Sequence, residues 1–258
     1  MPVAGVDVGS VAAKAVVLDE EKKIVLGRAV LPTGWNSREA GEQVLQAACR
    51  AAGVEPAGLR RVVGTGYGRV ALPFADKVVT EISCHARGAS WLFPATGVVL
   101  DIGGQDSKVI NLDETGHVSG FMMNDKCAAG TGRFLEMMAR TLELDMEEMS
   151  RRGLTWEKEL TISSMCTVFA ESEVISLIAD NHTDSDIIHG LNQSIAGKTA
   201  AMAARAKGQP PYMMTGGVAR NRGVVQALEE KLGAKLFISE NPDLCGALGA
   251  ALFALHGD

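Results

Sequence analysis

The sequence predicts an α/β protein built from mixed sheets and flanking helices, and three observations lead to that class. The chain of 258 residues is 47% hydrophobic, so it can build substantial cores. Short apolar strand patterns alternate with segments of helical periodicity along the chain. A segment near the N-terminus also recurs in the middle of the chain, which indicates two halves built on one plan.

The internal repeat pairs AGVDVGSVAAKAVVLDE with VVLDIGGQDSKVINLDE. Asp7 aligns with Asp101, and Lys14 aligns with Lys108. In both copies an apolar strand runs into Asp, turns at Gly and resumes as a second apolar strand. The repeat therefore predicts two β-hairpins, each of which presents an acid, a glycine turn and a lysine.

Helical and strand patterns alternate through the rest of each half. Between the two hairpins we expect a helix over 37–52, a strand over 61–63, a glycine-rich GTGYGR turn and a helix over 82–93. After the second hairpin we expect two helices that each follow a cysteine, a helix over 187–207, a strand over 212–215, a helix over 221–232, a strand over 235–239 and a helix over 246–255. Pro94 marks the expected end of the first half.

Composition argues against several classes of function. The formal net charge of −6 provides no basic footprint for nucleic acid. No stretch approaches the roughly 18 uninterrupted apolar residues of a membrane span, and MPVAGVDVGS lacks the pattern of a secretory signal. We therefore expect a cytoplasmic protein that binds neither nucleic acid nor membrane. Five widely spaced cysteines in such a chain argue against a disulfide framework.

The two hairpins offer the groups that a triphosphate with Mg²⁺ requires, namely close N–H donors, a cation and carboxylates for metal-bound water. Gly9 and Ser10 expose backbone N–H groups, and Lys14 adds a positive charge. We expect Asp7 to face Asp101 across a cleft, both as ligands of Mg²⁺ through water. The second turn adds Gly103, Gly104, Gln105 and Asp106. A lone DxG turn is usually an ordinary hairpin, but two copies in register and a later TGG turn favour nucleotide binding.

Cys127 and Cys166 each precede a predicted helix, in NDKCAAGTGRFLEMMAR and SSMCTVFAESEVISL. Unpaired N–H groups and the macrodipole at a helix N-terminus favour a thiolate, which ligates metal or attacks an electrophile. Zinc and an iron–sulfur cluster both fit this pattern, whereas a nucleophilic role lacks an evident His partner. We expect Cys49, in an apolar helix pattern, and Cys245 to be buried structural residues.

DVGSVAAK, LDIGGQDSK and MTGGVARN resemble the two phosphate motifs and the adenosine motif of the superfamily shared by sugar kinases, actin and chaperone ATPases. The resemblance implies two related lobes with the nucleotide in the cleft between them. It implies a first lobe over 1–94, on which a C-terminal helix over 246–258 packs back, and a second lobe over 95–245. Gly216, Gly217 and Asn221 would then lie near the adenosine.

A narrower resemblance rests on GTGYGR, ISCHARGAS, DIGGQDSKVI, NDKCAAGTGRFLE, SSMCTVFAESEVIS, TGGVARN and GALGAALFAL, which span nearly the whole chain in this order. These strings resemble the activator ATPases of 2-hydroxyacyl-CoA dehydratases, whose wider group includes the ATPase subunits of benzoyl-CoA reductase. The resemblance implies that Cys127 and Cys166 bind one [4Fe-4S] cluster at a homodimer interface. Since a Cys₄ cluster needs four thiolates, two per subunit imply a twofold axis through it.

The nucleotide contacts implied by the resemblance combine the hairpins with the turns before three helices. They are Asp7, Gly9, Ser10, Val11, Ala12, Lys14, Asp101, Gly103, Gly104, Gln105, Gly130, Thr131, Gly132, Gly216, Gly217, Asn221 and Gly246. Gln105 and Asp106 are the expected catalytic residues, which would activate the attacking water. The family pattern usually has a hydroxyl residue after GS, whereas Val11 and Ala13 occupy that stretch here.

The sequence therefore predicts a homodimeric ATPase, with ATP or ADP and Mg²⁺ as ligands, that accepts an electron from ferredoxin or flavodoxin. Its expected electron acceptor is an iron–sulfur enzyme, either a 2-hydroxyacyl-CoA dehydratase or a double-cubane cluster protein. Two rival functions share the fold. One is a sugar or acid kinase, which requires no cysteine pair, and the other is a regulatory ATPase with zinc or free thiols in place of the cluster.

Overall fold

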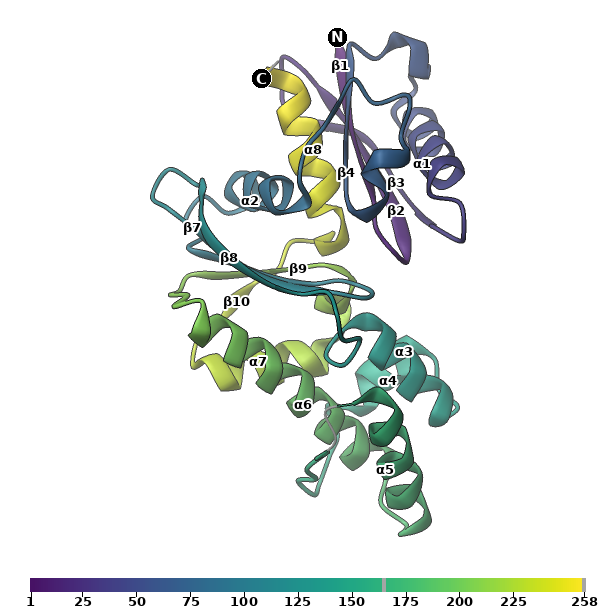
Figure 1. Cartoon of the computed structure of the whole chain (residues 1–258), viewed down its shortest axis with the longest axis vertical. Coiled ribbons are helices and arrows are strands. Elements are labelled where there is room, and N and C mark those ends of the chain that lie inside the picture. The colour runs from purple at the N-terminus through teal and green to yellow at the C-terminus, as the bar shows by residue number, and fades with distance from the viewer. Residues whose placement is uncertain (164–165, 257–258) are drawn as a thin grey trace.

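The computed structural model describes residues 1–163 and 166–256, and within them the chain forms two five-stranded sheets (Figure 1). The first sheet contains β1 (Pro2–Val8), β2 (Ala12–Asp19), β3 (Val25–Pro32), β4 (Arg61–Thr65) and β5 (Lys77–Val78). The second contains β6 (Val98–Ile102), β7 (Ser107–Leu112), β8 (Val118–Asn124), β9 (Tyr212–Thr215) and β10 (Leu236–Phe237). The strand orders are β3-β2-β1-β4-β5 and β10-β9-β6-β7-β8.

The two sheets follow one plan, as the internal repeat predicts. β1 pairs antiparallel with β2 and parallel with β4, and β6 pairs in the same way with β7 and β9. Asp7 lies opposite Lys14 in the first hairpin, and Asp101 lies opposite Lys108 in the second. Both sheets also shift register at the same step of the repeat, between their second and third strands. The mixed sheets therefore place an aspartate and a lysine side by side in each half.

The helices lie close to their predicted ranges. Those expected from periodicity are α1 (Ser37–Ala52), α2 (Glu81–Leu92), α6 (Asp184–Arg205), α7 (Arg222–Leu232) and α8 (Cys245–His256). The helices that follow the cysteines are α3 (Gly132–Thr141) and α5 (Thr167–Ala179), with the short α4 (Met146–Arg152) between them. Their starts are defined by side-chain caps at several points. The side chain of Asn36, for example, accepts a hydrogen bond from the backbone N–H of Glu39 at the start of α1.

Three strands have no counterpart among the sequence expectations, namely β3, β8 and the two-residue β5. β3 and β8 are the outer strands next to β2 and β7, and each has exposed residues along its length. An edge strand packs on fewer neighbours, so it carries a weaker apolar pattern than a central strand. β10 is also shorter than its predicted range, because it pairs with β9 at only two positions. The central strands were therefore the predictable part of each sheet.

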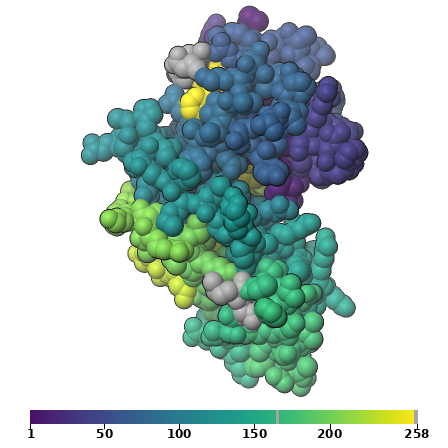
Figure 2. All heavy atoms as spheres, viewed as in Figure 1, coloured from purple at the N-terminus to yellow at the C-terminus, as the bar shows by residue number. Residues whose placement is uncertain are grey.

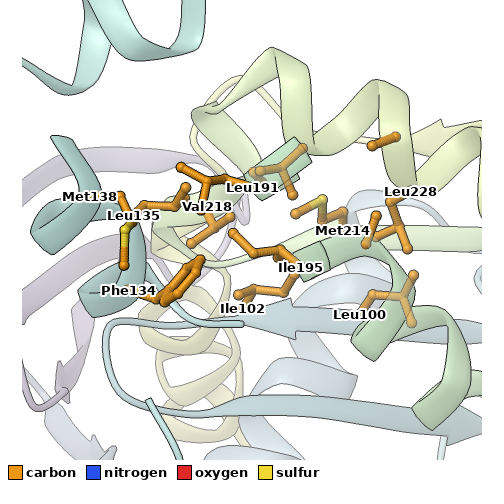
Figure 3. Close-up of a cluster of buried hydrophobic side chains, with 14 of the residues drawn as sticks. Leu100, Ile102, Phe134, Leu135, Met138, Leu191, Ile195, Met214, Val218 and Leu228 are labelled. Carbon is orange, nitrogen blue, oxygen red and sulfur yellow. The ribbon is translucent and has the colours of Figure 1, made fainter. Parts of the chain in front are cut away.

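The second half has the larger core, between its sheet and helices α3 to α7 (Figure 3). The labelled side chains in that core are Leu100, Ile102, Phe134, Leu135, Met138, Leu191, Ile195, Met214, Val218 and Leu228. In the first half α1 covers one face of the sheet and α8 covers the other. The approach of α8 is close, since a Cβ atom on Gly5 of β1 would overlap the α8 backbone at Ala247 and Ala251.

The C-terminal helix thus returns to the N-terminal sheet. Both chain ends lie at the same end of the molecule, and yellow atoms of α8 emerge within the purple and blue body in the space-filling view (Figures 1 and 2). α2 packs against α8, and its buried Ala86 and Ala89 also contact Val99 and Ile110 of the second sheet. α2 is therefore an element that touches both halves. No helix in the described part of the chain is long and apolar enough to span a membrane.

Candidate functional site

The two hairpins meet at their tips. The backbone N–H of Gly9 donates to the carbonyl of Ala12 (3.0 Å), and that of Gly103 donates to the carbonyl of Asp106 (2.9 Å), so each turn is closed in the same way. A Cβ atom on Gly104 would overlap the side chain of Val11, which shows that the second turn rests on the first. The structure therefore brings both repeated glycine turns to one place, with the carboxylates of the two central strands behind them.

Asp101 is held in a dense charge network in the second half. Lys108 Nζ lies 3.1 Å from Asp101 Oδ2, 2.8 Å from Asp106 Oδ2 and 3.6 Å from Glu81 Oε1. The hydroxyl of Thr215 donates to Asp101 Oδ1 over 2.9 Å. Burial alone would raise the pKa of Asp101, but the nearby positive charges and these hydrogen bonds hold it below its usual range. Burial would lower the pKa of Lys108, but the three carboxylates raise it.

Asp7 has a looser environment, although the backbone around it repeats that of Asp101. Lys14 Nζ is 3.5 Å from Asp7 Oδ2, and the lysine is less buried than its counterpart. A glycine with positive φ faces each aspartate, Gly66 (φ 87°) at Asp7 and Gly216 (φ 85°) at Asp101. A side chain on either glycine would strike the carboxylate, and an L-residue rarely adopts this φ. The GTGYGR turn is therefore the first-half counterpart of the TGG turn.

The sequence assigns the GTGYGR turn no role in the site. Gly66 lies in a turn that directly follows β4, and Gly216 lies in a turn that directly follows β9. Thr65 pairs with Asp7 across the first sheet, and Thr215 pairs with Asp101 across the second. The available signal was the Thr-Gly step that ends each of these strands, which alignment of the two halves could have revealed.

Gly246 lies between the two halves, against the side chains of Asp7 and His85. A Cβ atom at this position would be 2.8 Å from Asp7 Oδ2 and 2.9 Å from His85 Nε2. The other ring nitrogen of His85, Nδ1, is 3.2 Å from Thr215 Oγ1 and 3.5 Å from Asp101 Oδ1. The sequence did not identify His85 as part of this site, because His85 lies inside a helix and no local pattern marks it.

We expect Gly246→Ala to reduce ATP hydrolysis by displacing Asp7 or His85, since added volume in a packed site typically costs about 1–3 kcal/mol. Steady-state ATPase rates over a range of Mg-ATP concentrations measure the effect. Gly197→Ala in α6 is the matched control, because a Cβ atom there meets nothing within 4 Å. Wild-type kinetics in Gly246→Ala would show that this contact does not constrain the site.

The second hairpin is joined by hydrogen bonds to the start of α3. The N–H of Gly132 donates to the carbonyl of Gly103 (2.9 Å), and the N–H of Arg133 donates to the carbonyl of Gly104 (2.8 Å). Thr131, expected to contact the nucleotide, is fully buried, and its hydroxyl donates to the carbonyl of Ala128 over 2.6 Å. In this structure the N–H of Gly132 is therefore engaged with the phosphate hairpin itself.

Gln105, Asp106 and Asn221, which the sequence assigns to catalysis or to the adenosine, differ in exposure and in hydrogen bonding. Gln105 is exposed at the second turn, whereas the carboxylate of Asp106 is paired with Lys108. Asn221 is buried, and its Oδ1 accepts from the N–H of Val224 (3.1 Å) at the start of α7. Its Nδ2 has no hydrogen-bond partner among the described residues, and neither has the side-chain amide of the buried Asn192 nearby. These orphaned amides leave polar groups next to the TGG turn.

Cys127 and Cys166 are exposed, and the other three cysteines are buried. Cys166 is the N-cap residue of α5, as expected, and no side chain caps that helix. Cys127 lies just before the glycine turn that leads into α3, as the sequence predicts, and the N-cap residue of that helix is Thr131. Burial raises the pKa of Cys49, raises that of Cys84 to about 12 and raises that of Cys245 well above its usual range. The buried thiols are thus the poorer metal ligands.

Lys198 of α6 lies beside the turn that follows Cys127. A Cβ atom on Gly130, in the turn after Cys127, would lie 3.1 Å from Lys198 Cδ, so this α6 side chain packs against that turn. Burial lowers the pKa of Lys198, while charge interactions with both Cys127 and Cys166 act in the opposite direction. Among the described residues, no group of three or more His, Cys, Asp or Glu side chains could hold a metal ion.

Two copies of one hairpin, each with a glycine turn, an aspartate and a lysine, meet at their tips, and this arrangement is typical of two-lobed proteins that bind nucleotides. The model of the BadF/BadG/BcrA/BcrD ATPase family matches residues 4–254, and the chain belongs to this family. The protein is therefore an ATPase that binds ATP. The family resemblance and the fold class expected from the sequence are both confirmed.

Relatives cover nearly the whole chain. The chain is 42% identical to the 2-hydroxyisocaproyl-CoA dehydratase activator of Clostridioides difficile, over 97% of this chain and 93% of the relative. It is 43% identical to the (R)-2-hydroxyglutaryl-CoA dehydratase activating ATPase of Acidaminococcus fermentans, over 97% of this chain and 95% of the relative. These relatives favour an activator over a kinase.

Solved structures agree in fold. A structure of the Clostridium difficile activator with bound ADPNP covers 100% of this chain and 95% of its own at a TM-score of 0.95 and 41% identity. A hexokinase from Thermus thermophilus matches at a TM-score of 0.53 and 16% identity, covering 98% of each chain, which shows a shared fold alone. The sugar-kinase architecture is thus present without evidence of sugar kinase activity.

Proposed function

We propose that this protein is an ATP-dependent electron-transfer activator. It hydrolyses ATP to drive a low-potential electron from a [4Fe-4S] cluster to an iron–sulfur enzyme, of which a 2-hydroxyacyl-CoA dehydratase is the first candidate and a double-cubane cluster protein the second. The observation that carries the proposal is that Cys127 and Cys166 are exposed, whereas the other three cysteines are buried. The dehydratase activators among its relatives support the same function.

The nucleotide would occupy the junction between two lobes, one of residues 1–94 with 246–258 and the other of 95–245. Mg²⁺ fits there on the chemistry of the donors, because Asp7 and Asp101 are only 5% and 3% exposed and lie in cradles lined by glycines. We assign these two carboxylates to metal-bound water. Gln105, which is exposed at the turn, and Asp106 are assigned to orient the attacking water.

Cys127 and Cys166 fit an iron–sulfur cluster because their thiols are accessible, whereas the other three thiols are buried. When bound, the cluster would supply one-electron transfer, and it needs four thiolates. A second copy of the chain can provide the other two if the cluster lies on a twofold axis. α5 begins at Cys166 and exposes apolar residues that such a partner would cover, namely Val168, Phe169, Ile175 and Ile178. α5 also lies at the lower end of the molecule, where a second copy has access (Figure 1).

A change at the nucleotide site can be transmitted to the cysteines through contacts within the chain. The carbonyls of the second hairpin accept hydrogen bonds from the start of α3, and Cys127 lies just before the turn that leads into that helix. α3 in turn packs against α5. A change in the angle between the lobes would therefore shift both cysteine-bearing segments, which is how we propose that ATP repositions the redox centre.

The remaining assignments follow from the same function. Ferredoxin or flavodoxin would supply the electron, and the protein would act as a homodimer in the cytoplasm. A reducing compartment is required because the exposed thiols must remain reduced before they bind a metal.

Anaerobic purification with iron and sulfide analysis tests the proposal. We expect about four irons per dimer, a visible absorption band that dithionite bleaches, and Mg-ATP-dependent reduction of a 2-hydroxyacyl-CoA dehydratase. Less than about two irons per dimer after reconstitution, with no reducible band, would reject electron transfer. Stoichiometric zinc would favour the regulatory ATPase, and phosphorylation of a sugar or acid would favour the kinase.

A further inference from the structure

His85 occupies the junction between the two hairpin aspartates. It is a buried residue of α2, and its Nδ1 lies 3.2 Å from Thr215 Oγ1 and 3.5 Å from Asp101 Oδ1. The Thr215 hydroxyl has one proton, and the hydroxyl donates to Asp101 Oδ1 over 2.9 Å. Nδ1 must therefore carry a proton and donate to the hydroxyl. A continuous chain of donors runs from His85 through Thr215 to Asp101.

The other ring nitrogen faces the first half. His85 Nε2 and Asp7 Oδ2 lie 2.9 and 2.8 Å from the same point, the position of a Cβ atom on Gly246. Because that residue is glycine, no side chain separates the imidazole from the carboxylate. The ring thus contacts the Asp101 side of the junction through Nδ1, and its Nε2 lies on the side of Asp7 without a direct hydrogen bond to that carboxylate.

The position of this ring is set by helix packing on both sides. One turn earlier in α2, Glu81 reaches the lysine that pairs with Asp101, since Lys108 Nζ is 3.6 Å from Glu81 Oε1. Residues four apart lie on one helix face, so the side chains of Glu81 and His85 both face the second hairpin. Gly88 of α2 packs directly on the backbone of Cys245 at the start of α8. α2 therefore carries the ring on an element fixed against the first half.

We propose that His85 is a positioning residue of the ATPase, which orients the carboxylate of Asp101 through Thr215 at the lobe junction so that Asp101 can serve the same hydrated Mg²⁺ as Asp7. The inference rests on the proposed Mg-ATP site and deepens it. Groups that orient metal-binding carboxylates typically contribute roughly 10- to 100-fold to metal affinity. His85 acts through Thr215 and Asp101 and needs no contact with the metal or the nucleotide.

The test titrates Mn²⁺ by EPR into the full-length protein with a non-hydrolysable ATP analogue, in parallel with the Mg²⁺ dependence of ATPase activity. We expect His85→Ala to raise the Mn²⁺ dissociation constant roughly 10- to 100-fold. Thr215→Val removes the relaying hydroxyl with little change of shape, and should weaken Mn²⁺ binding in the same direction. His85→Asn retains a donor near the Nδ1 position and should restore part of the affinity.

The double variant sharpens the test. If His85 acts on Asp101 through Thr215, His85→Ala combined with Thr215→Val should weaken Mn²⁺ binding by less than the product of the two single effects. His189→Ala is the matched control, since this buried histidine of α6 stacks on Trp156 at a ring separation of 3.9 Å, outside the site. The control should retain the wild-type Mn²⁺ affinity.

Folded His85→Ala protein with wild-type Mn²⁺ affinity would overturn the inference, as would an equal loss in His189→Ala. Failure of the proposed metal site is a separate result. If Asp7→Asn and Asp101→Asn leave Mn²⁺ binding unchanged, the metal assignment fails and the inference fails with it. If those variants weaken binding and His85→Ala does not, the inference alone fails. None of these measurements depends on the cluster or the electron acceptor.

Discussion

Cys166→Ser protein is expected to fold, to bind ATP and to contain no iron–sulfur cluster. The substitution removes one ligand from each subunit of a shared site, so a dimer loses two of four thiolates. Serine replaces the exposed N-cap residue of α5 and is itself a good helix cap, so the fold of the chain should be preserved. Iron and sulfide analysis after anaerobic reconstitution, with EPR of the reduced protein, measures the result.

The dimer should weaken in the same variant, because the cluster is proposed to bridge the two copies. Sedimentation at several concentrations would detect the shift toward monomer. Cys49→Ser is the control for the chemical change, since Cys49 is buried in α1 away from the exposed pair, and it should bind iron fully. A fully loaded Cys166→Ser protein would mean that a different set of cysteines holds the cluster.

Lys108→Met is expected to cause the largest loss of folding stability in the chain's charge network, of about 3–5 kcal/mol. Lys108 is 3% exposed, and its removal leaves Asp101, Asp106 and Glu81 without their shared cation. Urea denaturation followed by circular dichroism gives the free energy of unfolding. The double variant Lys108→Met with Asp101→Asn should recover part of the loss, because it no longer leaves that carboxylate charged and unpaired.

Lys14→Met provides the matched comparison at the equivalent position of the first hairpin. Its ammonium lies 3.5 Å from Asp7, and its side chain is 17% exposed, so solvent screens the pair more strongly. We expect a clearly smaller loss of stability than in Lys108→Met. If the two variants lost equal folding stability, burial of the Lys108–Asp101 pair would not explain how much that pair stabilises the protein.

The pH dependence of the same network has a defined sign. The folded pKa of Asp101 lies below its unfolded value, so its contribution is present above about pH 4 and is lost as the pH falls further. The folded pKa of Lys108 lies above its unfolded value, so its contribution is present below about pH 10 and is lost as the pH rises beyond that. The stability difference between wild type and Lys108→Met should therefore be largest between these limits.

Much of the fold was predictable because the repeated hairpins occupy the centres of both sheets. β1, β2, β6 and β7 are buried on most positions, so their apolar patterns are strong. β3 and β8 were not predicted, because an edge strand has fewer packing partners and therefore a weaker apolar pattern. Helix ends were close to expectation where caps are explicit, as at Asn221 of α7.

The candidate site was predictable only in part. Asp7, Asp101 and their glycine turns lie in a repeat, and repetition distinguishes them from ordinary hairpins. His85 and Lys198 lie in helices, and no local pattern marks either one. His85 belongs to the site because α2 packs at the junction of the halves, and Lys198 because α6 passes the turn after Cys127. Such relations arise from tertiary packing.

The sequence by itself determined the two-part plan and the acid and lysine of each hairpin, because each is encoded by a local pattern or by its repetition. Only the tertiary structure decided which charges share a partner, and that Lys108 serves three carboxylates while Lys14 pairs with Asp7. It also decided that one imidazole lies between both halves. The reason is physical, since burial and the meeting of distant segments set electrostatic strength, and neither quantity is a property of a short stretch of chain.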